Sequence, residues 1–452
     1  MPSFDVSRFT YHVSRLWSGD ASAFRWALAI FVTMRVSLSL IAALALFQFP
    51  LYATTYYHGV APVPPGIANA LLGVWQRGDT IWYTKIAMQG YAQGDGTTVF
   101  FPLYPLLTRL AGKVLWGNYL LGGIIISSVA YFLVLVYLYK LSRLEFDSQV
   151  AARTIVYLSV FPTAFFLLGV YTESLFLLFA VSAFYYARKG NWLAAGVTGL
   201  LAALTKQLGL LLLLPLLYEY LAQSSKLTPL KKVCSEARPR ADFRTRERLR
   251  ELFSVDSKRK VQSSNFQFPI SNLQLQGDVL LLALIPIGTL AFLLFRHFCI
   301  GEPSLVETYR MRWAVNASWP WSNIADSLTA IFNTGRFPAL NPEDTLLRRI
   351  FYNSFDLACV GLFGFLAIVS FRRLRLSYGL YMVSVLFVAL MQNFRPPYPI
   401  AALPRYVLVL FPGFMVLGAM VENETLHWAV VVFSTVLLAL FTAMFATWRV
   451  VA

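Results

Sequence analysis

One carboxylate in the first polar stretch of the chain is placed where it could act as a general base. Asp79 opens a segment in which Asp79, Tyr83, Ile86 and Gly90 share one face of a helix, because they are spaced i, i+4, i+7 and i+11. A carboxylate at such a position can take a proton from a hydroxyl nucleophile. The same residue could be only the N-cap of that helix, with the nearby aromatic side chains forming a membrane-interface belt.

A second group of charged side chains could hold a phosphate. Lys206 interrupts a long apolar run, Arg395 and Arg405 lie near another turn, and Glu173 lies at a turn between two apolar runs. Each cation could simply extend to lipid headgroups, and Glu173 could be an ordinary loop carboxylate. Three cations beside an outer carboxylate would instead suit a lipid substrate that carries a phosphate, together with a base for a hydroxyl nucleophile.

The elements that would position these residues are membrane helices. Of the 452 residues, 58% are hydrophobic and 13% are charged, which excludes a soluble multi-domain protein and a disordered chain. The net charge of +16 would suggest nucleic acid in a soluble protein, but in a membrane protein it reflects topology, since Lys and Arg gather in cytoplasmic loops. The three cysteines and four histidines are scattered, so they indicate neither a disulfide framework nor a metal site.

Apolar runs and basic loops predict about eleven membrane helices in a single membrane domain, 1–452. Arg8, Arg15 and Arg25 precede the first run and place the N-terminus in the cytoplasm. The predicted single spans are 26–49, 119–140, 153–172, 174–188, 279–298, 351–371, 376–393, 404–420 and 427–447. Residues 192–220 are predicted to form a hairpin of two short helices with Thr205-Lys206-Gln207 at its outer tip; one long span with Lys206 buried is the alternative.

Three long connections separate these helices. Residues 49–118 form an outer loop with interfacial helices that contains Asp79, residues 222–277 form a basic cytoplasmic loop, and residues 299–350 form a second outer loop. Most of the 38 Lys and Arg residues then fall on the cytoplasmic side. The sequence shows no internal repeat, which counts mildly against a transporter built from inverted halves.

Five motifs resemble, in order and in approximate spacing, those of the PIG-V-like mannosyltransferases, whose eukaryotic members add the second mannose of the GPI anchor. They are Gln76-Arg77-Gly78-Asp79 through Gly90-Tyr91, Phe100-Phe101-Pro102-Leu103-Tyr104-Pro105, Tyr171-Thr172-Glu173-Ser174-Leu175-Phe176, Thr205-Lys206-Gln207-Leu208-Gly209-Leu210 followed by Pro215 and Glu219, and Leu403-Pro404-Arg405-Tyr406-Val407-Leu408 with Phe411-Pro412. Gly78 departs from the family pattern, where Trp is usual, and Lys206 stands in place of Arg. Without soluble domains, the chain resembles the bacterial members.

The resemblance implies a GT-C fold in a bacterial inner membrane, with its active site on the outer face and a polyprenyl-phosphate sugar as donor. Asp79 would be the general base for the acceptor hydroxyl, and inversion at the anomeric carbon would release polyprenyl phosphate. Lys206, Arg395 and Arg405 would hold the donor phosphate without a metal or another cofactor. The acceptor and substrate would be positioned by Arg77, Trp82, Tyr83, Tyr104, Glu173 and Gln207.

The sequence therefore predicts a glycosyltransferase that moves a mannosyl residue from polyprenyl-phosphate mannose to a lipid-linked or glycan acceptor, in contact with membrane lipids and not with nucleic acid. A polyprenyl-lipid flippase or transporter is the alternative from another class, and a GT-C enzyme for a different sugar is the alternative within the class. Asp79→Asn separates enzyme from transporter, because losing the base abolishes turnover but leaves lipid binding. The sequence identifies neither the acceptor nor a protein partner.

Overall fold

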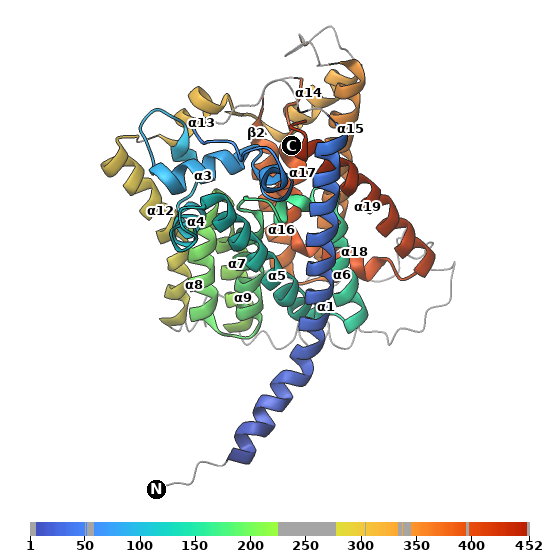
Figure 1. The fold of residues 1–452 in the computed structure, drawn as a ribbon. Helices are drawn as coiled ribbons and strands as arrows, with labels where there is room; N and C mark the ends of the chain where they lie inside the picture. The colour runs from blue at the N-terminus through green and yellow to red at the C-terminus, as the bar shows by residue number, and fades with distance from the viewer. Residues whose placement is uncertain are drawn as a thin grey trace.

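The computed structural model describes residues 6–49, 51, 58–224, 277–302, 304–332, 337, 345–394 and 397–449. Helices dominate the fold (Figure 1), and the sheet in these ranges is one antiparallel pair of short strands, β1 (Asn316–Ala317) and β2 (Gln392–Asn393). The predicted all-α architecture is confirmed.

Five helices in the described ranges are long and apolar enough to cross a membrane. They are α1 (Val6–Gln48, apolar from Ala21), α5 (Tyr119–Glu145), the segment Gly277–Ile300, α15 (Leu346–Arg373) and α19 (Glu424–Ala446). Gly277–Ile300 consists of η6 (Gly277–Ala283), α12 (Leu284–Phe295) and the π-helical turn η7 (Arg296–Ile300). Because such apolar surfaces need a hydrocarbon environment, the protein is an integral membrane protein.

Shorter helices complete the bundle. They are α6 (Ser148–Val160), α7 (Glu173–Arg188), α8 (Trp192–Thr205), α9 (Leu213–Ser224) and α16 (Leu376–Met391). Each is shorter than the roughly 20 residues of a full span, so helix length supports fewer full spans than the eleven predicted. α7 packs against α5 and α8 (Figure 1), and most of its side chains are buried.

The predicted hairpin at 192–220 is confirmed. α8 ends at Thr205, Lys206 has an extended backbone, and the chain returns through η4 (Gln207–Leu212) into α9. The Trp192 and Tyr220 rings, from the two ends of the hairpin, lie 4.9 Å apart. One long span with Lys206 inside it is therefore excluded.

Two predicted spans are broken, and both predictions were wrong on this point. In place of a helix over 153–172, α6 ends at Val160 and an irregular buried segment follows, with the single turn η3 (Ala164–Leu167). In place of a helix over 404–420, α17 (Leu403–Tyr406) and η8 (Val407–Val409) meet α18 (Phe411–Met420) at a bend of 75°. Pro162 and Pro412 lie at the two breaks, where a missing N–H and a restricted preceding residue disfavour a continuous helix.

The two segments that the sequence predicted as outer loops, called the outer segments below, gather at one end of the bundle (Figure 1). The first contains α2 (Ile67–Leu71), η1 (Gly73–Trp75), α3 (Asp79–Gln89), η2 (Thr97–Val99) and α4 (Leu103–Val114). The second contains α13 (Leu305–Trp313), β1 and α14 (Pro320–Phe332). Helices in the first outer loop were predicted, and they are confirmed.

A buried polar cluster ties four helices together at the far end of the hairpin. Glu219 of α9 accepts hydrogen bonds from Arg375 (3.0 Å) and from Ser377 of α16 (3.0 Å). Arg188 of α7 pairs with Glu145 of α5 at 2.5 Å. Glu219, one of the residues in the family-like motifs, therefore stabilises the helix packing.

Nearly all of the basic loop predicted at 222–277 lies outside the described residues.

Candidate functional site

A cavity of about 320 Å³ lies among the outer segments, the hairpin tip and the bent helix pair. Asp79 and Tyr83 line it from α3, Lys206 and Gln207 line it from the hairpin tip, and Arg405 lines it from α17. Its other walls are mostly aromatic and aliphatic: Val99, Phe100, Phe101, Tyr309, Trp313, Val315, Phe394, Ala401, Ala402 and Tyr406. A cavity of this size, with few polar groups on apolar walls, is typical of small-molecule sites.

The Asp79 carboxylate faces this cavity and does not cap its own helix. Gly78 occupies the N-cap position of α3, and no side-chain capping hydrogen bond is formed there. Instead, Asp79 Oδ2 accepts a hydrogen bond from Arg405 Nη1 at 2.5 Å. The side chain is 21% exposed, so it is accessible from the cavity. The interpretation of Asp79 as only an N-cap is therefore wrong.

Glu173 lies behind this pair and contacts both cations. Lys206 Nζ donates to Glu173 Oε1 at 2.7 Å, and Arg405 Nε lies 3.2 Å from the same oxygen. The Glu173 side chain is only 1% exposed. Lys206 also lies over the Tyr406 ring, 4.7 Å from its centre. Two carboxylates and two cations thus alternate as Asp79, Arg405, Glu173 and Lys206, and their formal charges cancel.

A tyrosine and a glycine fix the backbone that carries Asp79. The Tyr171 hydroxyl donates to the Arg77 carbonyl at 3.1 Å and accepts from the Asp79 amide at 3.2 Å. Gly78 lies between these groups with φ +54°, and a Cβ there would lie 2.4 Å from the Tyr171 hydroxyl. This close approach accounts for glycine at position 78.

Tyr83 joins α3 to the residue before Glu173. Its hydroxyl donates to Thr172 Oγ1 at 3.3 Å, and its ring contacts Phe100 and Tyr104 edge-on. Burial, followed by the nearby charges of Asp79 and Glu173, raises the pKa of Tyr83 well above its usual value. The phenol therefore stays neutral and serves as a hydrogen-bond donor at the cavity wall.

The structure brings together most, but not all, of the predicted site residues. Asp79, Tyr83, Lys206, Gln207 and Arg405 line one cavity, with Glu173 directly behind them; Arg395 lies outside the described residues.

Three predicted positioning residues do not line the cavity. The Arg77 guanidinium donates to the carbonyls of Gly73 (2.6 Å) and Ala446 (2.9 Å), so it anchors the loop before α3 to the end of α19. The Tyr104 hydroxyl is bonded inside the bundle, at 3.1 Å from the Gly123 carbonyl. Trp82 stacks on Phe100, with 6.1 Å between the ring centroids.

α13 contributes two cavity residues that were not predicted. Tyr309 and Trp313 are spaced i, i+4 on a short helix in the outer segment that the sequence marked only as a loop. Two aromatic residues at this spacing were the available signal. The Trp313 indole donates to the Gly96 carbonyl at 3.0 Å, which ties α13 to the loop after α3.

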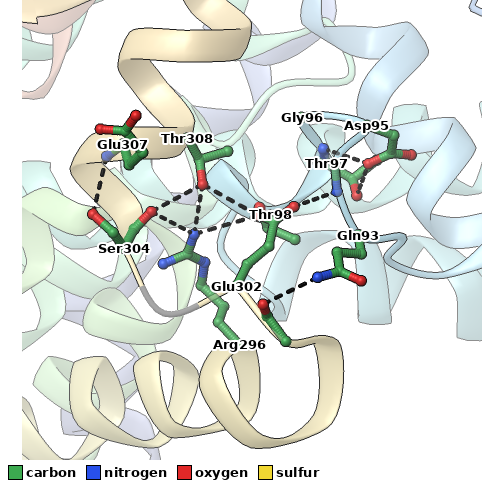
Figure 2. A network of polar contacts seen from close by, with 12 residues as sticks. Gln93, Asp95, Gly96, Thr97, Thr98, Arg296, Glu302, Ser304, Glu307 and Thr308 are labelled. Atoms are coloured by element: carbon green, nitrogen blue, oxygen red, sulfur yellow. Dashed lines mark hydrogen bonds and ion pairs between the residues drawn. The ribbon is translucent and has the colours of Figure 1, made fainter.

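A polar network holds the start of α13 against that loop, and Figure 2 shows its side chains from Thr98, Arg296, Glu302 and Thr308. Glu302 accepts hydrogen bonds from the Gly94 amide, the Thr98 hydroxyl and, at 3.2 Å, the Thr308 hydroxyl, and its carboxylate lies 3.6 Å from the Arg296 guanidinium. We call these five residues the outer clasp. Burial opposes the charge of Glu302, but the hydrogen bonds from Thr98, Gly94 and Thr308 outweigh it and lower the pKa of Glu302. The outer clasp thus connects two segments about 200 residues apart.

Part of the chain matches a known family. Residues 99–235 match the family described as dolichyl-phosphate-mannose-protein mannosyltransferase. The matched range includes Glu173 and the hairpin tip, and it supports the glycosyltransferase class that the motifs predicted. No curated protein matches the chain.

Three solved structures are similar to the chain. ArnT from Cupriavidus metallidurans, bound to undecaprenyl phosphate, has a TM-score of 0.46 and 12% identity, over 93% of this chain and 76% of that chain. The Archaeoglobus fulgidus oligosaccharyltransferase tethered to an acceptor peptide has a TM-score of 0.40 and 12% identity, over 94% of this chain and 55% of that one. The structure of the same archaeal enzyme with Zn and sulfate has a TM-score of 0.38 and 15% identity, over 92% of this chain and 52% of that one. This chain spans about half the length of the archaeal protein.

Proposed function

We propose that the protein is a membrane glycosyltransferase of GT-C type that transfers a hexose from a polyprenyl-phosphate donor to a hydroxyl of a lipid-linked or glycan acceptor. The observation that carries the proposal is the cavity shared by Asp79, Arg405 and Lys206, because a base and two phosphate-binding cations then face one bound substrate. The five motifs and the family matched by residues 99–235 favour mannose as the sugar. The distribution of basic residues favours the extracytoplasmic face of a bacterial inner membrane, with the N-terminus in the cytoplasm.

The proposed reaction is a single displacement at the anomeric carbon. The acceptor oxygen forms a bond to that carbon while the bond from carbon to the donor phosphate oxygen breaks, with inversion of configuration. Asp79 takes the proton of the acceptor hydroxyl, and polyprenyl phosphate leaves with the electron pair of the broken bond. Arg405 and Lys206 stabilise the negative charge that develops on the leaving phosphate. Glu173 holds both cations in place from behind.

The first test is sugar transfer by the purified protein in lipid. Radiolabelled polyprenyl-phosphate mannose and then the glucose analogue are offered, and transfer from the first is expected. Asp79→Asn should reduce transfer by about 10²- to 10⁴-fold, because a positioned general base contributes that much, and it should not weaken donor binding. Asp326→Asn is the matched control, since it removes the same charge from α14, outside the cavity.

Two results would contradict the proposal. Near wild-type transfer by Asp79→Asn would show that Asp79 is not the base. Binding of the lipid without transfer from either donor would instead favour a polyprenyl-lipid flippase or transporter, the alternative that an outer cationic site would also suit. Transfer of glucose but not mannose would keep the enzyme class and change the sugar.

A further inference from the structure

The charged cluster at the cavity is neutral before any substrate binds. Asp79 and Glu173 each carry one negative charge, and Arg405 and Lys206 each carry one positive charge, with every cation already within 3.2 Å of a carboxylate. A phosphate that entered this cluster without any rearrangement would meet as many negative charges as positive ones. A bound anion therefore needs a cation whose present carboxylate can be displaced.

Glu173 is the carboxylate that cannot easily lose its cation. Its side chain is 1% exposed, it is bonded to Lys206 at 2.7 Å, and it begins α7 in the buried centre of the protein. Withdrawing a cation from a fully buried carboxylate leaves an unpaired charge in a low-dielectric environment, which is strongly unfavourable. The Lys206–Glu173 pair is therefore the fixed half of the cluster.

Asp79 is the carboxylate that can lose its cation, Arg405. It lines the cavity, its side chain is 21% exposed, and water can solvate it when Arg405 leaves. Arg405 is held to Asp79 through Nη1 only, while its Nε, although 3.2 Å from Glu173, makes no aligned hydrogen bond. The guanidinium can thus turn toward an anion in the cavity and still remain beside Glu173.

We propose that the donor phosphate binds by taking Arg405 from Asp79, so that the carboxylate becomes available as a base only when the donor is in place. This inference deepens the proposed function and rests on it. The donor phosphodiester carries one negative charge, which replaces the charge of Asp79 as the partner of Arg405. The cluster with bound donor then contains a free carboxylate next to an anion.

The exchange of partners has a direct chemical consequence. A carboxylate without its guanidinium partner has its oxygen free to accept the proton of the acceptor hydroxyl. In the reaction, the acceptor proton goes to Asp79 while the phosphate leaves as polyprenyl phosphate, still bound to Arg405. Protonation removes the charge of Asp79 at the moment when the leaving phosphate gains charge. The product then dissociates as Arg405 returns to the reionised carboxylate.

The test is the affinity of undecaprenyl phosphate for the full-length protein in lipid nanodiscs. If Asp79 competes for Arg405, Asp79→Asn should bind this lipid about ten- to a hundredfold more tightly than the wild type, the value of one charge-assisted hydrogen bond. Asp79→Ala should show the same direction, and Asp326→Asn should bind like the wild type. In an Arg405→Gln background, Asp79→Asn should give no gain, because the contested cation is absent.

The outcomes separate this inference from the proposed function. Wild-type protein that binds undecaprenyl phosphate, combined with equal or weaker binding by both folded Asp79 variants, overturns the exchange and leaves the function standing. A gain in affinity that persists in the Arg405→Gln background also overturns it, since the gain would then be a general charge effect. If no form binds undecaprenyl phosphate and the wild type transfers no sugar, the proposed function fails and the inference fails with it.

Discussion

Gly78→Ala should slow sugar transfer strongly, because it strains the backbone that carries Asp79. The residue has φ +54° and ψ −129°, a region open to glycine, and a side chain there costs about 1–3 kcal/mol. The new Cβ would lie 2.4 Å from the Tyr171 hydroxyl, so about 1 Å of movement is needed to reach ordinary contact. Tyr171 is buried against Phe166, and its hydroxyl bonds the Asp79 amide, so Asp79 moves with it. A displacement of about 1 Å at a catalytic group can cost about a hundredfold in rate.

The assay compares the initial rate of transfer at saturating donor with the thermal stability of each variant in the same lipid. Gly90→Ala is the matched control: Gly90 ends the same helix with φ +89°, and a Cβ there meets nothing within 4 Å. It should lose comparable stability but keep its transfer rate. Tyr171→Phe should partly restore transfer in the Gly78→Ala background, since it removes the hydroxyl that the Cβ meets. Wild-type transfer by Gly78→Ala, or equal slowing by Gly90→Ala, would refute this reasoning.

Three further substitutions test the supports of the site. Glu173→Gln leaves Lys206 without its carboxylate, and we expect the free energy of unfolding, measured by denaturation in detergent, to fall by about 3–5 kcal/mol. An unchanged free energy of unfolding would show that the buried Lys206–Glu173 pair does not stabilise the protein. Gly209→Ala places a Cβ 2.3 Å from the α8 backbone and should lower the free energy of unfolding by about 1–3 kcal/mol. Gly361→Ala, with open space around its Cβ, should not lower it, and equal effects of the two substitutions would contradict the close packing at Gly209. Because the pKa of Glu302 is lowered, its carboxylate stabilises the outer clasp at pH values above the usual Glu pKa, and this stabilisation is lost as the pH falls through the folded-state pKa. Amide hydrogen exchange in α13, corrected for intrinsic exchange, should therefore rise as the pH falls through that pKa. In Glu302→Gln the corrected exchange should be high at every pH.

The charged residues of the cavity could be predicted from their local sequence. Lys206 interrupts a long apolar run and Arg405 lies near the start of another, where charged residues are rarely kept without a partner or a role. Asp79 was predicted instead from its position at the start of a helix in a polar stretch. The hairpin was predictable for the same reason, since a lysine in the middle of an apolar run favours a turn over a span. Their pairing could not be predicted, because it joins residues 326 positions apart.

The motifs did not separate residues that line the cavity from residues that support it. Arg77 lies two residues before Asp79, and only the fold shows that its guanidinium binds the carbonyl of Ala446, 369 residues away. α13 was missed because it is short, carries several charges and lies in an outer loop. What holds it in place is the outer clasp, another contact between distant segments. Local patterns report which side chains are unusual, and long-range contacts decide what they touch.

The breaks in the helices, only some of which the apolar pattern predicted, are what assemble the charged cluster. Asp79 and Glu173 each begin a helix after irregular chain, Lys206 joins α8 to η4, and Arg405 lies in the short helix before the 75° bend. Irregular backbone at the depth of a membrane must be buried in protein or line a polar cavity, because its N–H and C=O groups need partners. Arg35 donates such a hydrogen bond to the Leu168 carbonyl in the segment before α7, and Thr163 of that segment donates one to the Pro404 carbonyl of α17. Continuous helices would have carried these four charged side chains apart from one another. Helix ends that meet inside the protein bring them into one neutral cluster, in which Arg405 can exchange its carboxylate partner for a phosphate.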